Sequence, residues 1–113
     1  MPLNVLFVCS RNQWRSPTGE RMYRKSTDIA VRSAGTSQSA RRALTLKDLQ
    51  WADIVLVMEG KHKDRITAKF RQDTRHKPIH ILDIPDDYHF MDPELIDEIT
   101  HKAGPIIAAA LNR

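Results

Sequence analysis

Four short apolar runs, separated by stretches of helical pattern, limit the folds open to this chain. They lie at residues 4–8, 29–31, 53–58 and 78–82 and are rich in β-branched and aliphatic side chains. Such runs are typical of buried parallel strands, which need crossover helices to connect them. The pattern therefore predicts one α/β domain over residues 1–113, a single-domain four-stranded parallel sheet with helices on both faces.

The helical stretches carry start signals. Ser16 followed by Pro17 predicts a helix over residues 16–25 with Ser16 as its N-cap, because proline is favoured at the first helical position. Asp92 and Pro93 give the same signal before the last helix. The remaining helices are predicted at residues 45–51 and 61–72.

The loop after the first apolar run carries the residues with a distinct chemistry. Cys9 follows this run, and Arg15 comes immediately before the predicted helix. If the loop curls into a ring, its backbone amides point inward and form an anion site, and a guanidinium binds two oxygens of a phosphoryl group at once. A helix N-terminus and a nearby cation also stabilise a thiolate. We therefore expect a phosphoryl group to be bound here and transferred to Cys9.

Such a transfer needs a proton donor for the leaving oxygen. Asp86 and Asp87 are the leading candidates, since they follow the last strand on the side where parallel strands end. Asp92 is better explained as a helix cap. The sequence leaves open whether Asp86, Asp87 or Asp92 is the donor.

Composition sets further limits. The chain has one cysteine, which excludes an internal disulfide, and a net charge of +4, which suits an anionic substrate. We expect a cytoplasmic protein without a membrane segment, because no leader pattern and no long apolar stretch occur. The five histidines lack zinc-like spacing, so neither a metal nor a cofactor is expected. The basic residues of 61–77 are better explained as a solvated face than as a nucleic-acid site.

Several motifs resemble one family in order along the chain. VLFVCSRNQWRSPT, residues 5–18, resembles the phosphate-binding loop of the low-molecular-weight protein tyrosine phosphatases, Cys-x-Gly-Asn-x-Cys-Arg-Ser. Residues 33–36 are similar to that family's Ser-Ala-Gly-Thr segment. Residues 44–49 and 52–58 are similar to its next helix and strand, and residues 84–88 are similar to its Val-Pro-Asp-Pro-Tyr loop. The resemblance implies a phosphatase I-like (flavodoxin-like) architecture. It also implies hydrolysis of phosphotyrosine or aryl phosphate monoesters through a phosphocysteine, on a phosphorylated protein or small aryl phosphate, with inorganic phosphate as product.

The resemblance implies a role for each matching residue. Cys9 is the nucleophile, Arg15 the phosphate ligand and Asp86 the general acid. Asn12 and Ser16 shape the loop and stabilise the thiolate, and Ser33 supports the loop. The phosphate-binding residues are Ser10, Arg11, Asn12, Gln13, Trp14, Arg15 and Ser16, and the possible substrate rim is Trp14, Asp87 and Tyr88.

The chain departs from the family pattern at three positions and in length. Arg11 replaces the loop glycine, Trp14 its second cysteine, and Asp87 the proline after the acid. A helix-containing stretch after Thr36 is missing, so one wall of the cleft is expected to be open. Two alternatives therefore stay open: a non-catalytic phosphate- or phosphopeptide-binding module on the same loop, and an arsenate-reductase-like enzyme that relies on external thiols because Cys9 is alone.

Overall fold

The four apolar runs form strands β1 (Leu3–Cys9), β2 (Ile29–Gly35), β3 (Ile54–Val57) and β4 (Ile79–Ile81) in the computed structural model, which describes residues 2–112. The strands pair in parallel in the order β2-β1-β3-β4. They alternate with helices α1 (Arg15–Tyr23), α2 (Leu46–Trp51), α3 (Gly60–Lys69) and α4 (Pro93–Leu111). The predicted four-stranded parallel sheet is confirmed.

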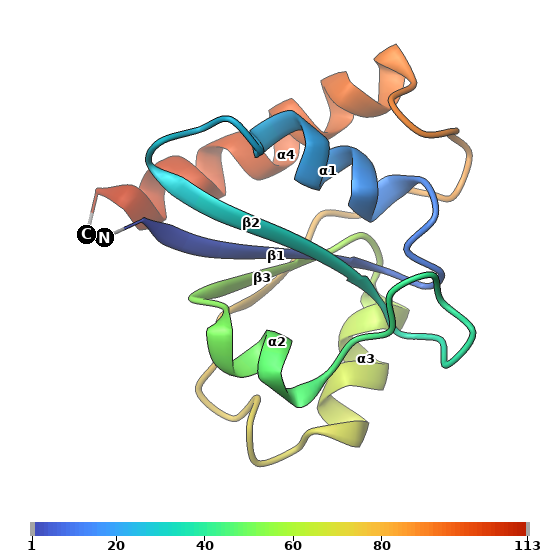
Figure 1. Ribbon diagram of the computed structural model, residues 1–113, viewed down its shortest axis with the longest axis vertical. Coiled ribbons are helices and arrows are strands. Elements are labelled where there is room, and N and C mark those ends of the chain that lie inside the picture. The colour runs from blue at the N-terminus through green and yellow to red at the C-terminus, as the bar shows by residue number, and fades with distance from the viewer. Residues whose placement is uncertain (1, 113) are drawn as a thin grey trace.

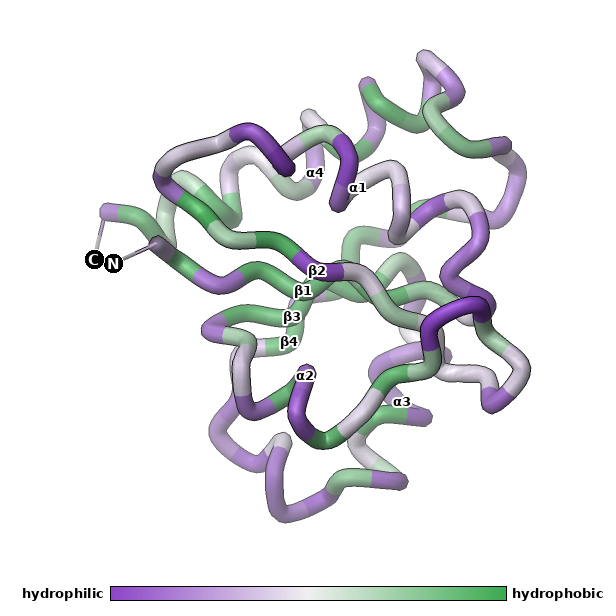
Figure 2. The backbone as a smooth tube through the Cα atoms, viewed as in Figure 1, coloured by the Kyte–Doolittle hydropathy of each residue, from purple (hydrophilic) through white to green (hydrophobic). Residues whose placement is uncertain are grey.

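Helices cover both faces of the sheet, as predicted. Helices α1 and α4 lie on one face, and α2 and α3 lie on the other (Figure 1). Alternating side chains of β1 supply both interfaces: Val5 and Phe7 belong to the core that includes residues of α4, and Leu6 and Val8 to the core that includes residues of α2 and α3. The apolar residues follow the strands through the centre of the molecule (Figure 2).

Several predicted boundaries differ from the observed ones: the helix predicted at residues 61–72 ends at Lys69, and the one predicted at residues 16–25 ends at Tyr23. Two further differences fall near Cys9. Helix α1 begins at Arg15 with Trp14 as a cap that makes no side-chain hydrogen bond, so Ser16 is not the N-cap but a buried residue of the first turn. Strand β2 continues past Val31 to Gly35, because it pairs with β1 over that whole length. A Cβ on Gly35 would lie 2.6 Å from the carbonyl oxygen of Ser10, so glycine permits this close approach.

The connection from β2 to α2 contains no helix. Its backbone packs against the loop that follows Cys9. The amides of Thr36, Ser37 and Arg41 donate to the carbonyl oxygens of Cys9 (2.9 Å), Ser10 (2.9 Å) and Arg11 (3.0 Å). This connection therefore supports the outer side of the loop.

Candidate active site

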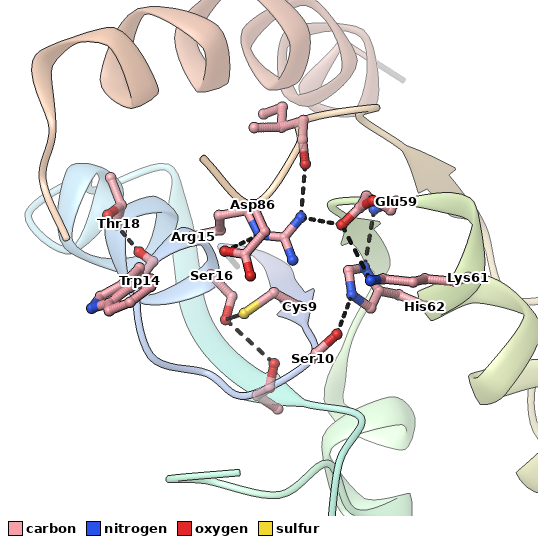
Figure 3. Close-up of polar contacts among 12 residues, drawn as sticks. Cys9, Ser10, Trp14, Arg15, Ser16, Thr18, Glu59, Lys61, His62 and Asp86 are labelled. Atoms are coloured by element: carbon pink, nitrogen blue, oxygen red, sulfur yellow. Dashed lines mark hydrogen bonds and ion pairs between the residues drawn. The ribbon is translucent and has the colours of Figure 1, made fainter. Parts of the chain in front are cut away.

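The loop of residues 10–14 lies at the edge of the sheet where all four parallel strands end. The same edge brings Ser33 of β2, Glu59 after β3 and the segment of residues 84–86 after β4 next to it. Figure 3 shows Glu59 and Asp86 close to Arg15 and Cys9. This convergence follows from the topology, since side chains at the carboxyl ends of parallel strands share one edge.

The Cys9 sulfur is held among buried hydroxyl groups. Its Sγ lies 3.0 Å from the Oγ of Ser16. The whole Cys9 residue is 3 % exposed. Asn12, with a positive φ of 53°, donates from Nδ2 to the Oγ of Ser16 and the Oγ of Ser33, both at 2.9 Å. Ser33 in turn donates to the carboxylate of Glu20. Ser16 accepts from Asn12, so its one hydroxyl hydrogen is donated either to the carbonyl oxygen of Ala34, at 3.4 Å, or to the sulfur of Cys9. The contact with the sulfur is the shorter one and would stabilise a thiolate on Cys9.

Arg15 closes the loop and is almost completely buried, at 2 % exposure. Its Nη1 donates to the Glu59 carboxylate at 2.5 Å and to the carbonyl oxygen of Ile84 at 2.8 Å. The carboxylate of Asp86 lies 3.6 Å from Nε, and its side chain is 59 % exposed. Since the scaffold holds Nη1, the edge formed by Nε and Nη2 is the part of the guanidinium suited to two oxygens of an anion.

Glu59 and His62, at the start of α3, form the polar wall beside Arg15. Burial favours a raised pKa for Glu59, but the hydrogen bond and charge of Arg15 outweigh it and hold this pKa below its usual value. Burial and the charge of Arg15 lower the pKa of His62 from 6.5 to about 4. Glu59 is therefore a carboxylate and His62 a neutral imidazole near neutral pH.

The hydrogen bonds of His62 identify its tautomer. Its Nδ1 accepts from the backbone N–H of Glu59 at 3.0 Å, and its Nε2 lies 2.8 Å from the Oγ of Ser10. A neutral ring whose Nδ1 accepts carries its hydrogen on Nε2, so His62 donates to Ser10. Both ring nitrogens are thus used.

Besides the contact of Arg15 with Asp86, the segment that carries Asp86 contacts Thr18 of α1 and Trp14, the N-cap residue of that helix. The backbone N–H of Met91 donates to the Oγ1 of Thr18 at 2.9 Å, and Thr18 donates to the carbonyl oxygen of Trp14 at 2.7 Å. The rings of Trp14 and His89 meet edge to face, with centroids 4.8 Å apart. Trp14 therefore joins the loop to the segment of residues 86–91.

The structure brings together six of the residues that the sequence singled out: Cys9, Asn12, Arg15, Ser16, Ser33 and Asp86. Asp92 is the N-cap of α4, because its carboxylate accepts from the backbone N–H of Glu94 at 2.9 Å. Tyr88 packs against the apolar core beside α4, and Arg11 and Gln13 are exposed. Within residues 2–112, no hydrogen bond or ion pair joins Asp87 to the loop.

Sequence reasoning missed Glu59, His62, Thr18 and Glu20. Glu59 could have been found, because it follows a buried strand at the same sheet edge as Cys9. The contacts of the others depend on how α1 and α3 pack, and the sequence carries no local signal for them.

Two features are absent from the part of the chain that the structure describes. Within residues 2–112, no group of three or more His, Cys, Asp or Glu side chains could hold a metal ion. No helix in that range has the length and apolar character needed to cross a membrane.

Comparison with known proteins shows a shared fold. The chain superimposes on the tyrosine phosphatase Wzb from Escherichia coli K30 in complex with sulphate with a TM-score of 0.76 and 19 % identity, over 97 % of this chain and 99 % of that one. It matches the YwlE arginine phosphatase from Geobacillus stearothermophilus with a TM-score of 0.69 and 22 % identity, over 99 % and 97 %. Wzb from Vibrio vulnificus in complex with benzylphosphonate gives a TM-score of 0.69 and 22 % identity, over 99 % of each chain.

No protein-family model matches the sequence, and no curated protein matches it. The fold expected from the motif resemblance is confirmed by the solved structures.

Proposed function

We propose that this chain is a cysteine-dependent phosphatase that hydrolyses phosphotyrosine or other aryl phosphate monoesters through a phosphocysteine. The observation that carries the proposal is the Cys9 sulfur, 3.0 Å from the Ser16 hydroxyl, in a loop closed by the buried Arg15. The fold shared with tyrosine and arginine phosphatases supports it.

In the first step the Cys9 thiolate attacks phosphorus. The S–P bond forms while the bond from phosphorus to the leaving oxygen breaks, and the Asp86 carboxyl group gives its proton to that oxygen. The amides of residues 10–16 and the Nε–Nη2 edge of Arg15 bind the three remaining phosphoryl oxygens. Asp86 is proposed as the donor because its carboxylate lies 3.6 Å from Arg15, whereas Asp92 caps a helix.

In the second step a water molecule attacks the phosphocysteine. The Asp86 carboxylate accepts a proton from the water, the P–O bond forms and the S–P bond breaks. Inorganic phosphate leaves, and the Cys9 thiolate is restored with Ser16 donating to it. The step consumes only water, so it needs no further thiol and no cofactor.

An aryl leaving group is proposed because aromatic side chains flank the acid segment. The rings of Trp14 and His89 meet edge to face beside it. Tyr88 follows Asp86 and Asp87 in the same segment. Among the solved structures of this fold are a tyrosine phosphatase and an arginine phosphatase, so phosphoarginine is the competing substrate class to be measured.

The test compares wild type with Cys9→Ser and Asp86→Asn on p-nitrophenyl phosphate, a phosphotyrosine peptide and a phosphoarginine peptide. We expect turnover of the two aryl phosphates that Cys9→Ser abolishes. Binding of inorganic phosphate without turnover would indicate the non-catalytic module instead. Arsenate reduction that depends on added thiol, with no phosphate release, would support the reductase alternative, and preference for phosphoarginine would refute the aryl assignment.

A further inference from the structure

We propose that His62 is a positioning residue of the phosphate-binding loop, acting through the hydroxyl of Ser10. The inference rests on the proposed function, because it assigns a task in binding the phosphoryl group. His62 was not among the residues that the sequence pointed to, and its ring does not touch Cys9 in any hydrogen bond of residues 2–112.

The first turn of α3 holds both ends of the loop. At one end, Nε2 of His62 donates to the Oγ of Ser10, the residue directly after Cys9, at 2.8 Å. At the other end, the Glu59 carboxylate accepts from Arg15 at 2.5 Å. The backbone N–H of Glu59 donates to Nδ1 of His62, which joins the two supports (Figure 3).

Ser10 is thereby held from both sides. Its carbonyl oxygen accepts from the amide of Ser37 on the β2–α2 connection at 2.9 Å, and its hydroxyl accepts from His62 on α3. The peptide planes on either side of Ser10 set the directions of the first amides of the loop. Fixing Ser10 therefore keeps those amides directed at an anion before it binds, which lowers the cost of binding.

A purely structural role does not account for this arrangement. An apolar side chain would fill the space of the fully buried His62, but it would leave the Glu59 N–H without its acceptor and the Ser10 hydroxyl without its donor. The neutral ring can serve both partners only as the Nε2–H tautomer. Its low pKa keeps it in that form at neutral pH.

Two substitutions separate the contact of His62 with the Glu59 N–H, which caps α3, from its contact with the Ser10 hydroxyl in the loop. In His62→Asn, the side-chain oxygen can still accept from the Glu59 N–H, but the side chain is too short to reach Ser10. In His62→Gln, the longer amide can donate to Ser10. Ser10→Ala removes the same hydrogen bond from the other side and leaves α3 intact, and His76→Asn, at an exposed histidine, is the matched control.

The readouts are the dissociation constant of inorganic phosphate, measured by calorimetry, and kcat/KM for p-nitrophenyl phosphate. One lost hydrogen bond predicts about a 10-fold weaker phosphate affinity in His62→Asn and in Ser10→Ala. The double variant should lose no more than either single one, His62→Gln should recover part of the loss, and His76→Asn should bind as wild type.

Each outcome decides a different point. Wild-type affinity in a folded His62→Asn, or additive losses in the double variant, would overturn the role of His62. If His62→Asn does not fold, wild-type phosphate affinity in Ser10→Ala would overturn the role of His62. Phosphate binding that depends on His62 and Ser10 in a protein without turnover would refute the phosphatase activity and leave this inference standing. A wild-type protein that binds no phosphate would overturn the inference.

Discussion

Acidification should destabilise this protein through His62 at a pH where its carboxylates are still charged. The charged groups around the buried ring are Arg15 of α1 and Glu59, Lys61 and Arg65 at the start of α3. Burial of the ring disfavours a proton on His62 in the native state, and three of these four groups are cations that add to this effect, so its pKa is about 4. In the unfolded chain the pKa returns to about 6.5.

The sign follows from which state binds the proton. Between pH 6.5 and about 4 the unfolded chain holds a proton on His62 and the native protein does not. The contribution of the neutral His62 to the free energy of unfolding is therefore fully present above pH 6.5 and is lost as the pH falls through this window. Since one pKa unit corresponds to about 1.4 kcal/mol, the loss from His62 at pH 5 is about 2 kcal/mol of the free energy of unfolding.

The measurement is urea unfolding between pH 5 and pH 7.5, followed by circular dichroism, for wild type and His62→Asn. Asparagine does not titrate, so the difference between the two pH profiles isolates His62 from every other group. We expect wild type to lose about 2 kcal/mol more than the variant between pH 7.5 and pH 5, with equal m-values. Parallel profiles would refute a buried neutral His62.

Three further predictions concern the loop and the acid segment. Asn12→Ala should lower the free energy of unfolding by about 2 kcal/mol in urea, because two buried hydrogen bonds and a residue suited to positive φ are lost; an unchanged midpoint would contradict this. Asp86→Asn should slow steady-state turnover of alkyl phosphates far more than that of p-nitrophenyl phosphate, whereas Asp92→Asn, which preserves the cap, should not; the reverse result would move the acid to Asp92. Thr18→Val should lower kcat for phenyl phosphate several-fold with unchanged phosphate inhibition, because the Met91 N–H loses its acceptor, and Thr18→Ser should restore it.

The central strands and the position of Cys9 at the end of the first one could be predicted from local pattern. Residues 4–8 and 53–58 are apolar on both faces, which indicates burial on both sides and hence a parallel sheet with helices on both faces. The helix predicted at residues 45–51 is also confirmed as α2, and the start of α2 is a capping box of Thr45 and Asp48, whose hydrogen bonds are formed within one turn.

Ser16 shows where local pattern misleads. A serine before a proline is a common helix cap, and the prediction used that rule. In the structure its hydroxyl is instead 3.0 Å from Cys9 and accepts from Asn12. A contact across the loop, which the family resemblance implied for Ser16, replaces the capping bond that the helix-start rule predicted.

The sequence by itself determined the parallel α/β fold, the thiol and guanidinium that border the loop, and the segment that carries Asp86. These depend on short-range patterns: apolar runs, helix starts and the spacing of Cys9 from Arg15. Only the tertiary structure decided that Glu59 pairs with Arg15, that His62 holds Ser10 and that Thr18 fastens the acid segment. Each of these contacts joins residues from 44 to 73 positions apart, so it exists only once the sheet has brought separate elements to one edge.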